Sequence, residues 1–250
     1  MRLTIHITFY YNESRLGYLN QVLQFIDAYP HHCDVFVHTN AAKFTTDPLY
    51  KNSNGTTVIV PHDLGTESGF YLTWKCRDLM KSQLPDYDAF VYLEDDIGMP
   101  GEALAYWLQH KDICTRNGYN LGFLRVERGR DSSALFVTDL NKPMTRRLSI
   151  DGAEFVLNDV NPYCGFWIYD RDTFRAFTES PYYEVARIAG YGIREKSAIG
   201  LHGVRTPFYK GTVLPMKEGS VDPGCKVYHL PNNYIGHPAF ATIPIHKIVV

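Results

Sequence analysis

The sequence lacks the features that mark several classes of protein. No apolar run is long enough to span a bilayer, and Met1 leads directly into the apolar stretch 3–11, which predicts a strand and not a secretory signal. Lysine and arginine form no long block and the net charge is only −2, which argues against a nucleic-acid surface. We therefore expect a soluble cytoplasmic protein that binds no nucleic acid.

Cysteine is scarce and scattered. The five cysteines contain no CxxC pair and are Cys33, Cys76, Cys114, Cys164 and Cys225. An odd, dispersed set fits reduced thiols better than a disulfide framework or a zinc module. The dense cluster of His and Asp that a zinc hydrolase would need is also missing.

Two phosphate-binding motifs are missing as well. The loop after the first predicted strand reads FYYNESR at positions 9–15, with neither the GxGxxG of dinucleotide-binding folds nor the GxxxxGK[ST] of phosphate-binding NTPases. If a nucleotide binds to this chain, its phosphates therefore need another counter-charge. A carboxylate-bound metal ion is the available one.

The alternation of an α/β protein is present instead. Strands are predicted at 3–11, 34–40, 56–61 and 88–93, with helices at 16–26 and after Ser68. This β-α-β-β-α-β order predicts a mostly parallel central sheet flanked by helices.

The second half of the chain is less regular. Here we predict helices at 101–113 and 173–178, with Leu104, Trp107 and Leu108 facing inward on the first of them, and strands at 121–126, 133–138 and 152–160. No linker or repeat interrupts the sequence. The simplest expectation is one domain over residues 1–250, with a nucleotide-binding half (1–100) and an acceptor-binding half (101–250).

The stretch DAFVYLEDDIGMP at 88–100 carries the strongest chemical signal. Its apolar run predicts a strand buried on both faces. Three adjacent anions follow, Glu94, Asp95 and Asp96, which repel one another and are costly to bury without partners. A divalent cation would resolve that conflict, at a strand end where open α/β sheets bind their ligands. The alternative is an acidic turn, with Pro100 opening the next helix.

With this arrangement the chain resembles the GT-A fold glycosyltransferases, the nucleotide-diphosphosugar transferases, as ordered landmarks over most of its length. Leu93-Glu94-Asp95-Asp96 is similar to an EDD variant of the family's DxD motif, which holds Mn²⁺ or Mg²⁺ against the sugar-nucleotide diphosphate. The resemblance implies that Asp96 is a metal ligand. It implies that Glu94 and Asp95 contact the ribose or bind the metal through water.

The stretch YCGFW at 163–167 resembles the glycine-containing loop under the donor sugar in that family. Glycine lets the backbone approach a ligand, and a tryptophan ring can offer an apolar face to a sugar. The resemblance implies sugar contacts by Gly165, Phe166 and Trp167. The alternative is an aromatic core strand with a glycine bulge.

The stretch YGIREKSAIGL at 191–201 resembles a family segment with an acidic residue at a helix start. Arg194-Glu195 stands where the family usually has two acids, which is a departure. The resemblance implies that Glu195 is the general base, its anion stabilised by the helix amino terminus. A solvated surface glutamate is the alternative, and Glu184 is the rival base.

A late histidine follows in KVYHLPNNY at 226–234. Family members often return such a histidine to the metal, which implies that His229 joins the carboxylates, with His237 as the alternative. Imidazole and carboxylates together suit Mn²⁺.

The resemblance also implies a donor-binding set. Family members contact the nucleoside at the ends of the first strands, and basic residues before the acidic strand reach the base or diphosphate. The corresponding positions here are Tyr10, Tyr11, Asn40, Asp63, Lys75 and Arg77. The last two are otherwise surface charges that balance the carboxylates.

These features predict an enzyme, a metal-dependent glycosyltransferase that moves a sugar from a nucleoside-diphosphate sugar (UDP- ahead of GDP-) to a hydroxyl of a glycan or lipid-linked acceptor. Glu195 as base implies inversion at the anomeric centre, and retention is the alternative. A lipid-linked acceptor would add peripheral contact at the inner face of a membrane. Two other functions stay open: a non-catalytic carbohydrate-binding module on the same fold, and a sugar-nucleotide pyrophosphorylase, although the loop at 9–15 lacks the glycine-rich basic sequence of that class.

Overall fold

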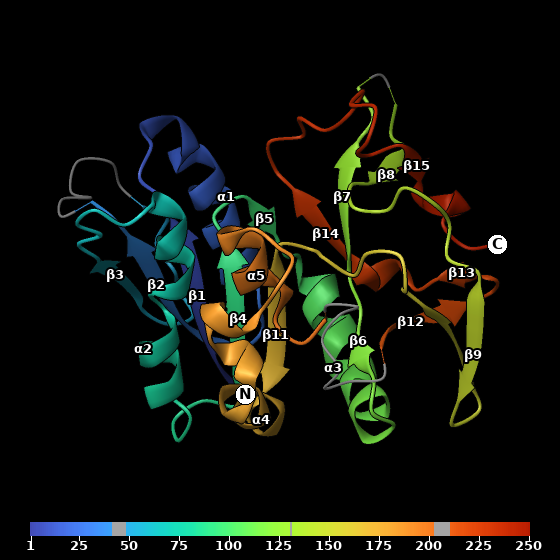
Figure 1. Cartoon of the computed structure of the whole chain (residues 1–250), viewed down its shortest axis with the longest axis horizontal. Helices are drawn as coiled ribbons and strands as arrows, with labels where there is room; N and C mark the ends of the chain where they lie inside the picture. The colour runs from blue at the N-terminus through green and yellow to red at the C-terminus, as the bar shows by residue number, and fades with distance from the viewer. Residues whose placement is uncertain (42–48, 131, 203–210) are drawn as a thin grey trace. The chain divides into compact units, whose positions relative to one another are not determined.

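The strands of the first half pair with β11 from the second half into one sheet, in the order β11-β4-β1-β2-β3 (Figure 1). In this computed structural model, which describes residues 1–41, 49–130, 132–202 and 211–250, the five strands are β1 (Arg2–Phe9), β2 (His32–Thr39), β3 (Thr57–Pro61), β4 (Ala89–Glu94) and β11 (Phe166–Asp170). β1 pairs in parallel with both β2 and β4, and β2 with β3. β11 runs antiparallel to β4, so the sheet is mixed.

The chain divides into two compact units. The first contains Met1–Ile97 and Gly165–Gly200, and the second contains Gly98–Cys164 and Leu201–Val250. The predicted division after residue 100 lies close to the first boundary. Residues 165–200, however, return to the first unit, because β11 completes its sheet.

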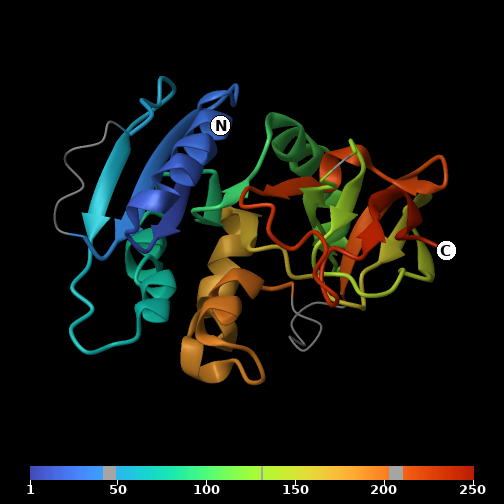
Figure 2. The same cartoon turned by 90° about the horizontal axis from the view of Figure 1, so that it is seen from above.

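The helices of the first unit cover both faces of this sheet. They are α1 (Leu16–Asp27), α2 (Arg77–Ser82), α4 (Arg171–Glu179) and α5 (Ile193–Ile199), with 3-10 turns η1 (Glu13–Arg15), η2 (Gly69–Trp74), η3 (Pro181–Tyr183) and η4 (Val185–Arg187). The helix expected after Ser68 is therefore split into η2 and α2. Figure 2 shows α1 on one face and α2, α4 and α5 on the other.

The strand order explains this placement. The chain first moves from β1 outward to β2 and β3, and then returns to β4 on the other side of β1. Because crossovers between parallel strands are right-handed, reversing the direction puts the two connections on opposite faces. The reversal leaves a crevice at the carboxyl ends of β1 and β4, the switch point where such sheets bind ligands.

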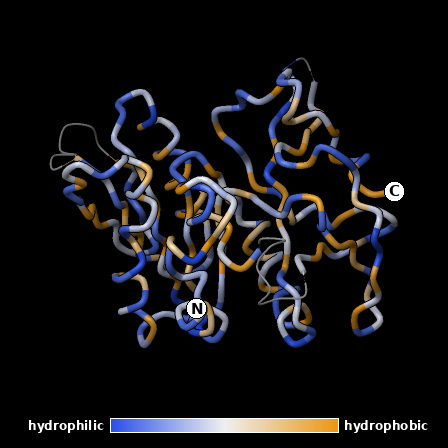
Figure 3. The backbone as a smooth tube through the Cα atoms, in the orientation of Figure 1, coloured by the Kyte–Doolittle hydropathy of each residue, from blue (hydrophilic) through white to orange (hydrophobic). Residues whose placement is uncertain are grey.

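Apolar residues follow the central strands of the sheet (Figure 3). Every residue of β4 is buried, and β1 is buried from Leu3 to Phe9. The expectation of a strand buried on both faces at 88–93 is confirmed. Its acidic end is thereby held inside the unit rather than displayed on a surface turn.

Three histidines form a hydrogen-bonded row across the same sheet, below its carboxyl edge. His6 Nδ1 lies 2.8 Å from His38 Nε2, and His38 Nδ1 lies 2.8 Å from His62 Nε2. His6 Nε2 lies 2.9 Å from Gln83 Oε1, which also accepts a hydrogen bond from Thr4. An amide oxygen only accepts, so His6 donates from Nε2, and each neighbour in turn must donate from its own Nε2.

Burial keeps the inner histidines neutral. It lowers the pKa of His6 to about 4, which a hydrogen bond with Gln83 opposes, and lowers that of His38 to about 2, with the charges of His6 and His62 adding to the effect. Both side chains are fully buried. The sequence patterns do not reveal this row of histidines, because the three residues meet only through the register of neighbouring strands.

Over its described residues, the second unit contains two small sheets and one long helix. One sheet has the order β13-β12-β10-β9 with β6 beside β12, and the other β15-β8-β7-β14-β5. Their strands are β5 (Ile97–Gly98), β6 (Asn120–Leu121), β7 (Leu124–Arg128), β8 (Leu135–Val137), β9 (Arg146–Ile150), β10 (Ala153–Leu157), β12 (Thr212–Lys217), β13 (Ser220–Val221), β14 (Lys226–His229) and β15 (Ile243–Pro244), with α3 (Gly101–Arg116) and turns η5 (Pro223–Cys225) and η6 (Ile245–Lys247).

Several expectations for this unit need correction. The strand expected at 121–126 is divided between β6 and β7, and β9 and β12 lie where no strand is expected. On α3, Leu104 and Trp107 are buried as expected, but Leu108 is 37% exposed. In the part of the chain that the structure describes, no helix has the length and apolarity to cross a membrane.

Candidate functional site

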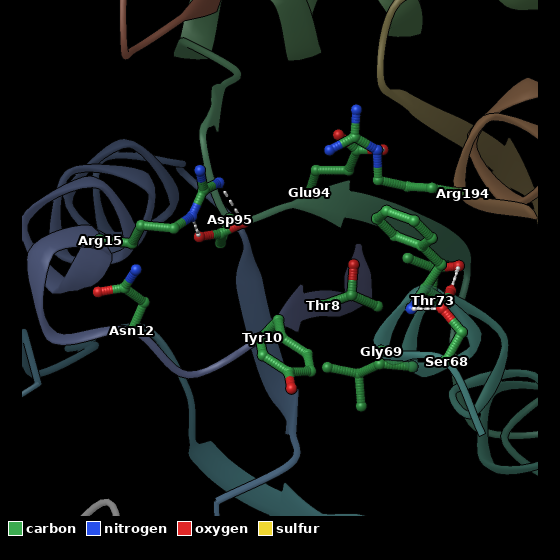
Figure 4. A pocket seen from close by; sticks show the side chains of 12 residues that line it. Thr8, Tyr10, Asn12, Arg15, Ser68, Gly69, Thr73, Glu94, Asp95 and Arg194 are labelled. Carbon is green, nitrogen blue, oxygen red and sulfur yellow. Dashed lines mark hydrogen bonds and ion pairs between the residues drawn. The ribbon is translucent and has the colours of Figure 1, made fainter. Parts of the chain in front are cut away.

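A cavity of about 390 Å³ opens in the first unit at the carboxyl ends of β1 and β4. Its walls come from the end of β1, the loop that follows, η2, the end of β4 and α5 (Figure 4). The lining residues are Thr8, Tyr10, Asn12, Arg15, Ser68, Gly69, Phe70, Leu72, Thr73, Glu94, Asp95 and Arg194. The acidic strand end therefore lies at the switch point of the sheet, where a ligand is expected.

The three acids are buried, and arginines balance most of their charge. Glu94, Asp95 and Asp96 are only 6–7% exposed. Arg15 donates from Nε and Nη2 to the two oxygens of Asp95, and from Nη2 to Asp96 Oδ2, each at 2.8 Å. This forked contact is among the stronger kinds of charged hydrogen bond.

The mutual contact shifts the pKa values of both partners. Burial raises the pKa of Asp95, the hydrogen bonds from Arg15 oppose this, and the charge of Asp96 adds to it. The same hydrogen bonds with Asp95 raise the pKa of Arg15. Arg15 is therefore always charged at this site, and Asp95 holds a proton more readily than an exposed aspartate.

A second guanidinium approaches the acids from α5. Arg194 Nε lies 3.9 Å from Glu94 Oε1, and Arg194 Nη2 lies 3.8 Å from Glu195 Oε1. Arg194 thus supplies a cation that faces the acidic strand. Counting Glu195, which also lies beside Arg194, four carboxylates meet two guanidinium groups, which leaves two net negative charges when all are ionised.

Two aromatic rings are exposed at the cavity, those of Tyr10 and Phe70. Tyr10 lies close over Gly69 (Figure 4), where a Cβ would come within 2.5 Å of Tyr10 Cε2. Gly69 therefore gives the ring its room. The adjacent Tyr11 is held by its backbone N–H, which donates to Asn40 Oδ1 at 2.8 Å.

The other predicted donor contacts lie elsewhere in the first unit. Asp63 Oδ1 accepts a hydrogen bond from Gly65 N at 2.8 Å and so shapes its own turn. Lys75 pairs with Glu67 at 2.7 Å. None of these lines the cavity at Asp95, and neither do Tyr11 and Asn40.

The expectation that Arg77 contacts a nucleotide phosphate or lies on the surface is wrong. Its side chain is buried and its guanidinium carbon lies 4.6–5.4 Å from the ring centres of four residues, namely Trp74, Trp167, Phe177 and Tyr183. Nη2 donates to Ser197 O at 3.1 Å. Cation–π contact of this kind stabilises a buried cation without a carboxylate. Arg77 therefore holds η2 and α2 against β11 and α5.

The aromatic stretch after Gly165 is a core strand, so the expected sugar contacts by ring faces are wrong. Phe166 is 0% and Trp167 1% exposed, as members of β11 paired with β4. The Trp167 ring stacks on Tyr92, and its Nε1 donates to Ser197 O at 3.0 Å. Gly165, with φ of 77°, takes the left-handed conformation as the chain enters the strand.

The two candidate bases have different surroundings. Glu195 lies in the first turn of α5, as expected, with its Oε2 2.1 Å from where a Cβ on the N-cap residue Gly192 would be. Its carboxylate thus folds back over the helix start, beside Arg194. Glu184 is 71% exposed, with Arg187 3.8 Å away, and lines a different cavity.

The two candidate histidine ligands belong to the second unit. His229 Nδ1 lies 2.5 Å from Glu127 Oε1, and the fully buried Glu127 side chain also accepts from Tyr234 N and Ile235 N. His237 Nδ1 accepts from Ala239 N at 3.1 Å. Among the described residues, no three His, Cys, Asp or Glu side chains are grouped to hold a metal ion.

Sequence reasoning missed several lining residues. Arg15 and Asn12 lie in the FYYNESR loop, which contains neither of the glycine-rich phosphate-binding motifs. A single arginine just after the first strand was the available signal. Ser68, Phe70 and Thr73 gave none, since they reach the cavity only because η2 passes over β1.

Comparison of the chain with protein-family models and with curated proteins found no match. The assignment of this site therefore depends on its geometry and chemistry.

Proposed function

We propose that the first unit binds a nucleoside-diphosphate sugar and that the protein is a metal-dependent glycosyltransferase of the GT-A type. The observation that carries this proposal is the acidic end of β4 at the switch point of the sheet. Two buried aspartates converge there on one cationic group, beside a cavity with exposed aromatic rings.

The acids fit a divalent cation in their geometry and chemistry. Three carboxylate oxygens, two from Asp95 and one from Asp96, each lie 2.8 Å from a nitrogen of the same guanidinium. Oxygens that converge on one positive group suit a hard cation, and Mg²⁺ in particular is usually held by one or two carboxylates plus substrate phosphates. Asp95 and Asp96 would hold Mg²⁺ or Mn²⁺, with Glu94 beside them. The ion would supply neutralisation of charge on the departing diphosphate.

The remaining lining residues suit the rest of a nucleotide sugar. The exposed rings of Tyr10 and Phe70 offer apolar faces to a nucleoside base. The hydroxyls of Thr8, Ser68 and Thr73 offer hydrogen bonds to its ribose. We assign UDP ahead of GDP as the nucleotide, and a hydroxyl of a glycan or lipid-linked molecule as the acceptor. A cytoplasmic setting, with peripheral membrane contact for a lipid-linked acceptor, is part of the same proposal.

Glu195 is the proposed base. As the acceptor oxygen attacks the anomeric carbon, its proton passes to the Glu195 carboxylate and the bond between that carbon and the diphosphate oxygen breaks. Glu195 lies in the first turn of α5, beside Arg194. A single displacement of this kind inverts the anomeric configuration.

A thermal-shift screen of nucleoside diphosphates and nucleotide sugars, with and without Mn²⁺, tests the proposal. We expect one nucleotide to raise Tm in a Mn²⁺-dependent manner, because a ligand that binds the folded state stabilises it. Asp96→Asn should lose the Mn²⁺-dependent part, whereas Asp172→Asn, which changes an exposed carboxylate 90% accessible to solvent, should keep it. If no nucleotide stabilises the wild-type protein at millimolar Mn²⁺, the proposal is wrong.

Arg15 favours one second candidate, a sugar-nucleotide pyrophosphorylase, since a basic residue does follow the first strand and lines the cavity. The two enzymes break different bonds of the same donor. Incubation with nucleotide sugar and pyrophosphate would release nucleoside triphosphate and sugar phosphate from a pyrophosphorylase. A glycosyltransferase would release nucleoside diphosphate, and only when an acceptor hydroxyl or water takes the sugar.

A further inference from the structure

Arg15 occupies the position against Asp95 and Asp96 that a divalent cation would need. Its Nε and Nη2 contact three oxygens of the two carboxylates, so a metal ion cannot reach those oxygens while the contact persists. Either Arg15 or the two aspartates must therefore move when a cation binds.

The two sides of the contact differ in their freedom to move. Asp95 and Asp96 directly follow the buried strand β4, and their side chains are 8% and 10% exposed. Arg15 ends the short turn η1, and its longer side chain is 33% exposed. The aspartates are therefore fixed by the sheet, and the arginine is the group that can swing out.

The charge of the site favours movement of Arg15 away from the aspartates when a cation binds. Glu94, Asp95, Asp96 and Glu195 carry four negative charges against the two positive charges of Arg15 and Arg194. An anionic diphosphate meets two excess negative charges and is repelled. A divalent cation on the aspartates cancels that excess and frees Arg15, whose planar fork suits phosphate oxygens.

We propose that Arg15 is a displaceable internal counter-cation. It neutralises Asp95 and Asp96 before the donor arrives, yields them to the divalent cation, and then binds the donor diphosphate. This inference rests on the proposed function for the identity of the diphosphate, although not for the competition between Arg15 and the metal. Since each event favours the other, cation and diphosphate bind with positive coupling, and the coupling is reciprocal.

Titration of Mn²⁺ alone, followed by electron paramagnetic resonance, tests the competition. Arg15→Ala should bind Mn²⁺ at least tenfold more tightly than the wild-type protein. Arg175→Ala is the control, because it removes the same charge from an exposed position on α4, outside the cavity, and leaves the contact of Arg15 with Asp95 and Asp96 intact. Its Mn²⁺ affinity should change by less than threefold.

Calorimetric titration of UDP at saturating Mn²⁺ tests the second role. Arg15→Ala should bind UDP at least tenfold more weakly than wild type, because the phosphates lose their guanidinium. The same substitution thus moves two affinities in opposite directions, whereas damage to the fold would weaken both.

The outcomes separate cleanly. Equal Mn²⁺ affinity in wild type and Arg15→Ala overturns the inference, and so does tighter Mn²⁺ binding with unchanged UDP affinity. If no nucleoside diphosphate binds any variant, the proposed function fails, and the Mn²⁺ titration alone still decides whether Arg15 competes. If Arg15→Ala does not fold, Arg15→Lys takes its place: lysine cannot fork across both carboxylates, so its Mn²⁺ affinity should still rise severalfold, and an unchanged affinity refutes the competition.

Discussion

Acidification to pH 5 should destabilise the first unit through its buried histidines. His6 and His38 are fully buried, and each uses an unprotonated Nδ1 to accept a hydrogen bond from the next ring. Their pKa values are lowered to about 4 and about 2. The folded protein therefore keeps both rings neutral at pH 5, while the unfolded chain takes up a proton on each.

The sign and size follow from proton linkage. A histidine in an unfolded chain has a pKa of about 6.5, so below that pH the unfolded state binds more protons and stability falls. Between pH 7 and pH 5 the loss is about 2 kcal/mol for each histidine that stays neutral when folded, or about 4 kcal/mol for the pair. The result depends little on the folded pKa values, provided that both lie below 5. Stability is retained above the unfolded pKa and lost as the pH falls below it.

Urea unfolding at pH 7, 6 and 5 measures the effect. His38→Gln keeps a polar side chain of similar size, and its loss of stability between pH 7 and pH 5 should be smaller than that of wild type by about 2 kcal/mol. The comparison cancels other groups, including Asp95, whose raised pKa acts in the opposite direction. His32→Gln, at an exposed position, is the control and should follow wild type within about 0.5 kcal/mol. Parallel pH profiles for wild type and His38→Gln would refute the reasoning.

Two further predictions concern buried charges. Arg77→Ala should lower the free energy of unfolding by about 3 kcal/mol, because four ring contacts and the hydrogen bond to Ser197 are lost. Arg77→Met should lower it by about 1 kcal/mol or less, since an apolar chain of similar shape replaces the buried charge. Urea unfolding compares the two variants, and equal losses of stability would contradict this account. Glu127→Ala should cost about 3 kcal/mol and expose the amides of residues 234 and 235 to hydrogen exchange, because it removes their shared acceptor. Glu154→Ala, which breaks an exposed ion pair, should cost about 0.5 kcal/mol and leave those amides protected.

Local patterns predicted the first unit well, because its strands are long and its chain order is regular. The acidic strand at 88–93 was predicted as buried on both faces from its apolar run alone, and β4 is buried throughout. The second unit was harder. Its strands are short, several have only two or three residues, and β9 begins with two exposed arginines and buries only its last residue.

Trp167 and Arg77 show why composition misleads at single positions. A tryptophan after a glycine and an arginine on a short helix both suggest ligand contact when read along the chain. In the folded unit they contact each other, since the Arg77 guanidinium lies 5.4 Å from the Trp167 ring, and both donate to the backbone oxygen of Ser197. Their partners come from several separate elements of the unit, so neither burial nor role is encoded in the neighbouring residues.

The charge balance at Asp95 and Asp96 also depends on a residue that is distant in the sequence, and it changes the chemistry expected of the site. Three adjacent acids in the sequence suggest that a bound cation must neutralise them. Arg15, which lies 80 residues from Asp95 along the chain, already neutralises part of their charge, because the parallel pairing of β1 with β4 brings the loop after β1 to the end of β4. While Arg15 stays in place, its guanidinium occupies the aspartate oxygens that a metal ion would need. A ligand that accepts the guanidinium as it leaves would make entry of the cation favourable, so an anionic donor and a divalent cation are expected to enter together.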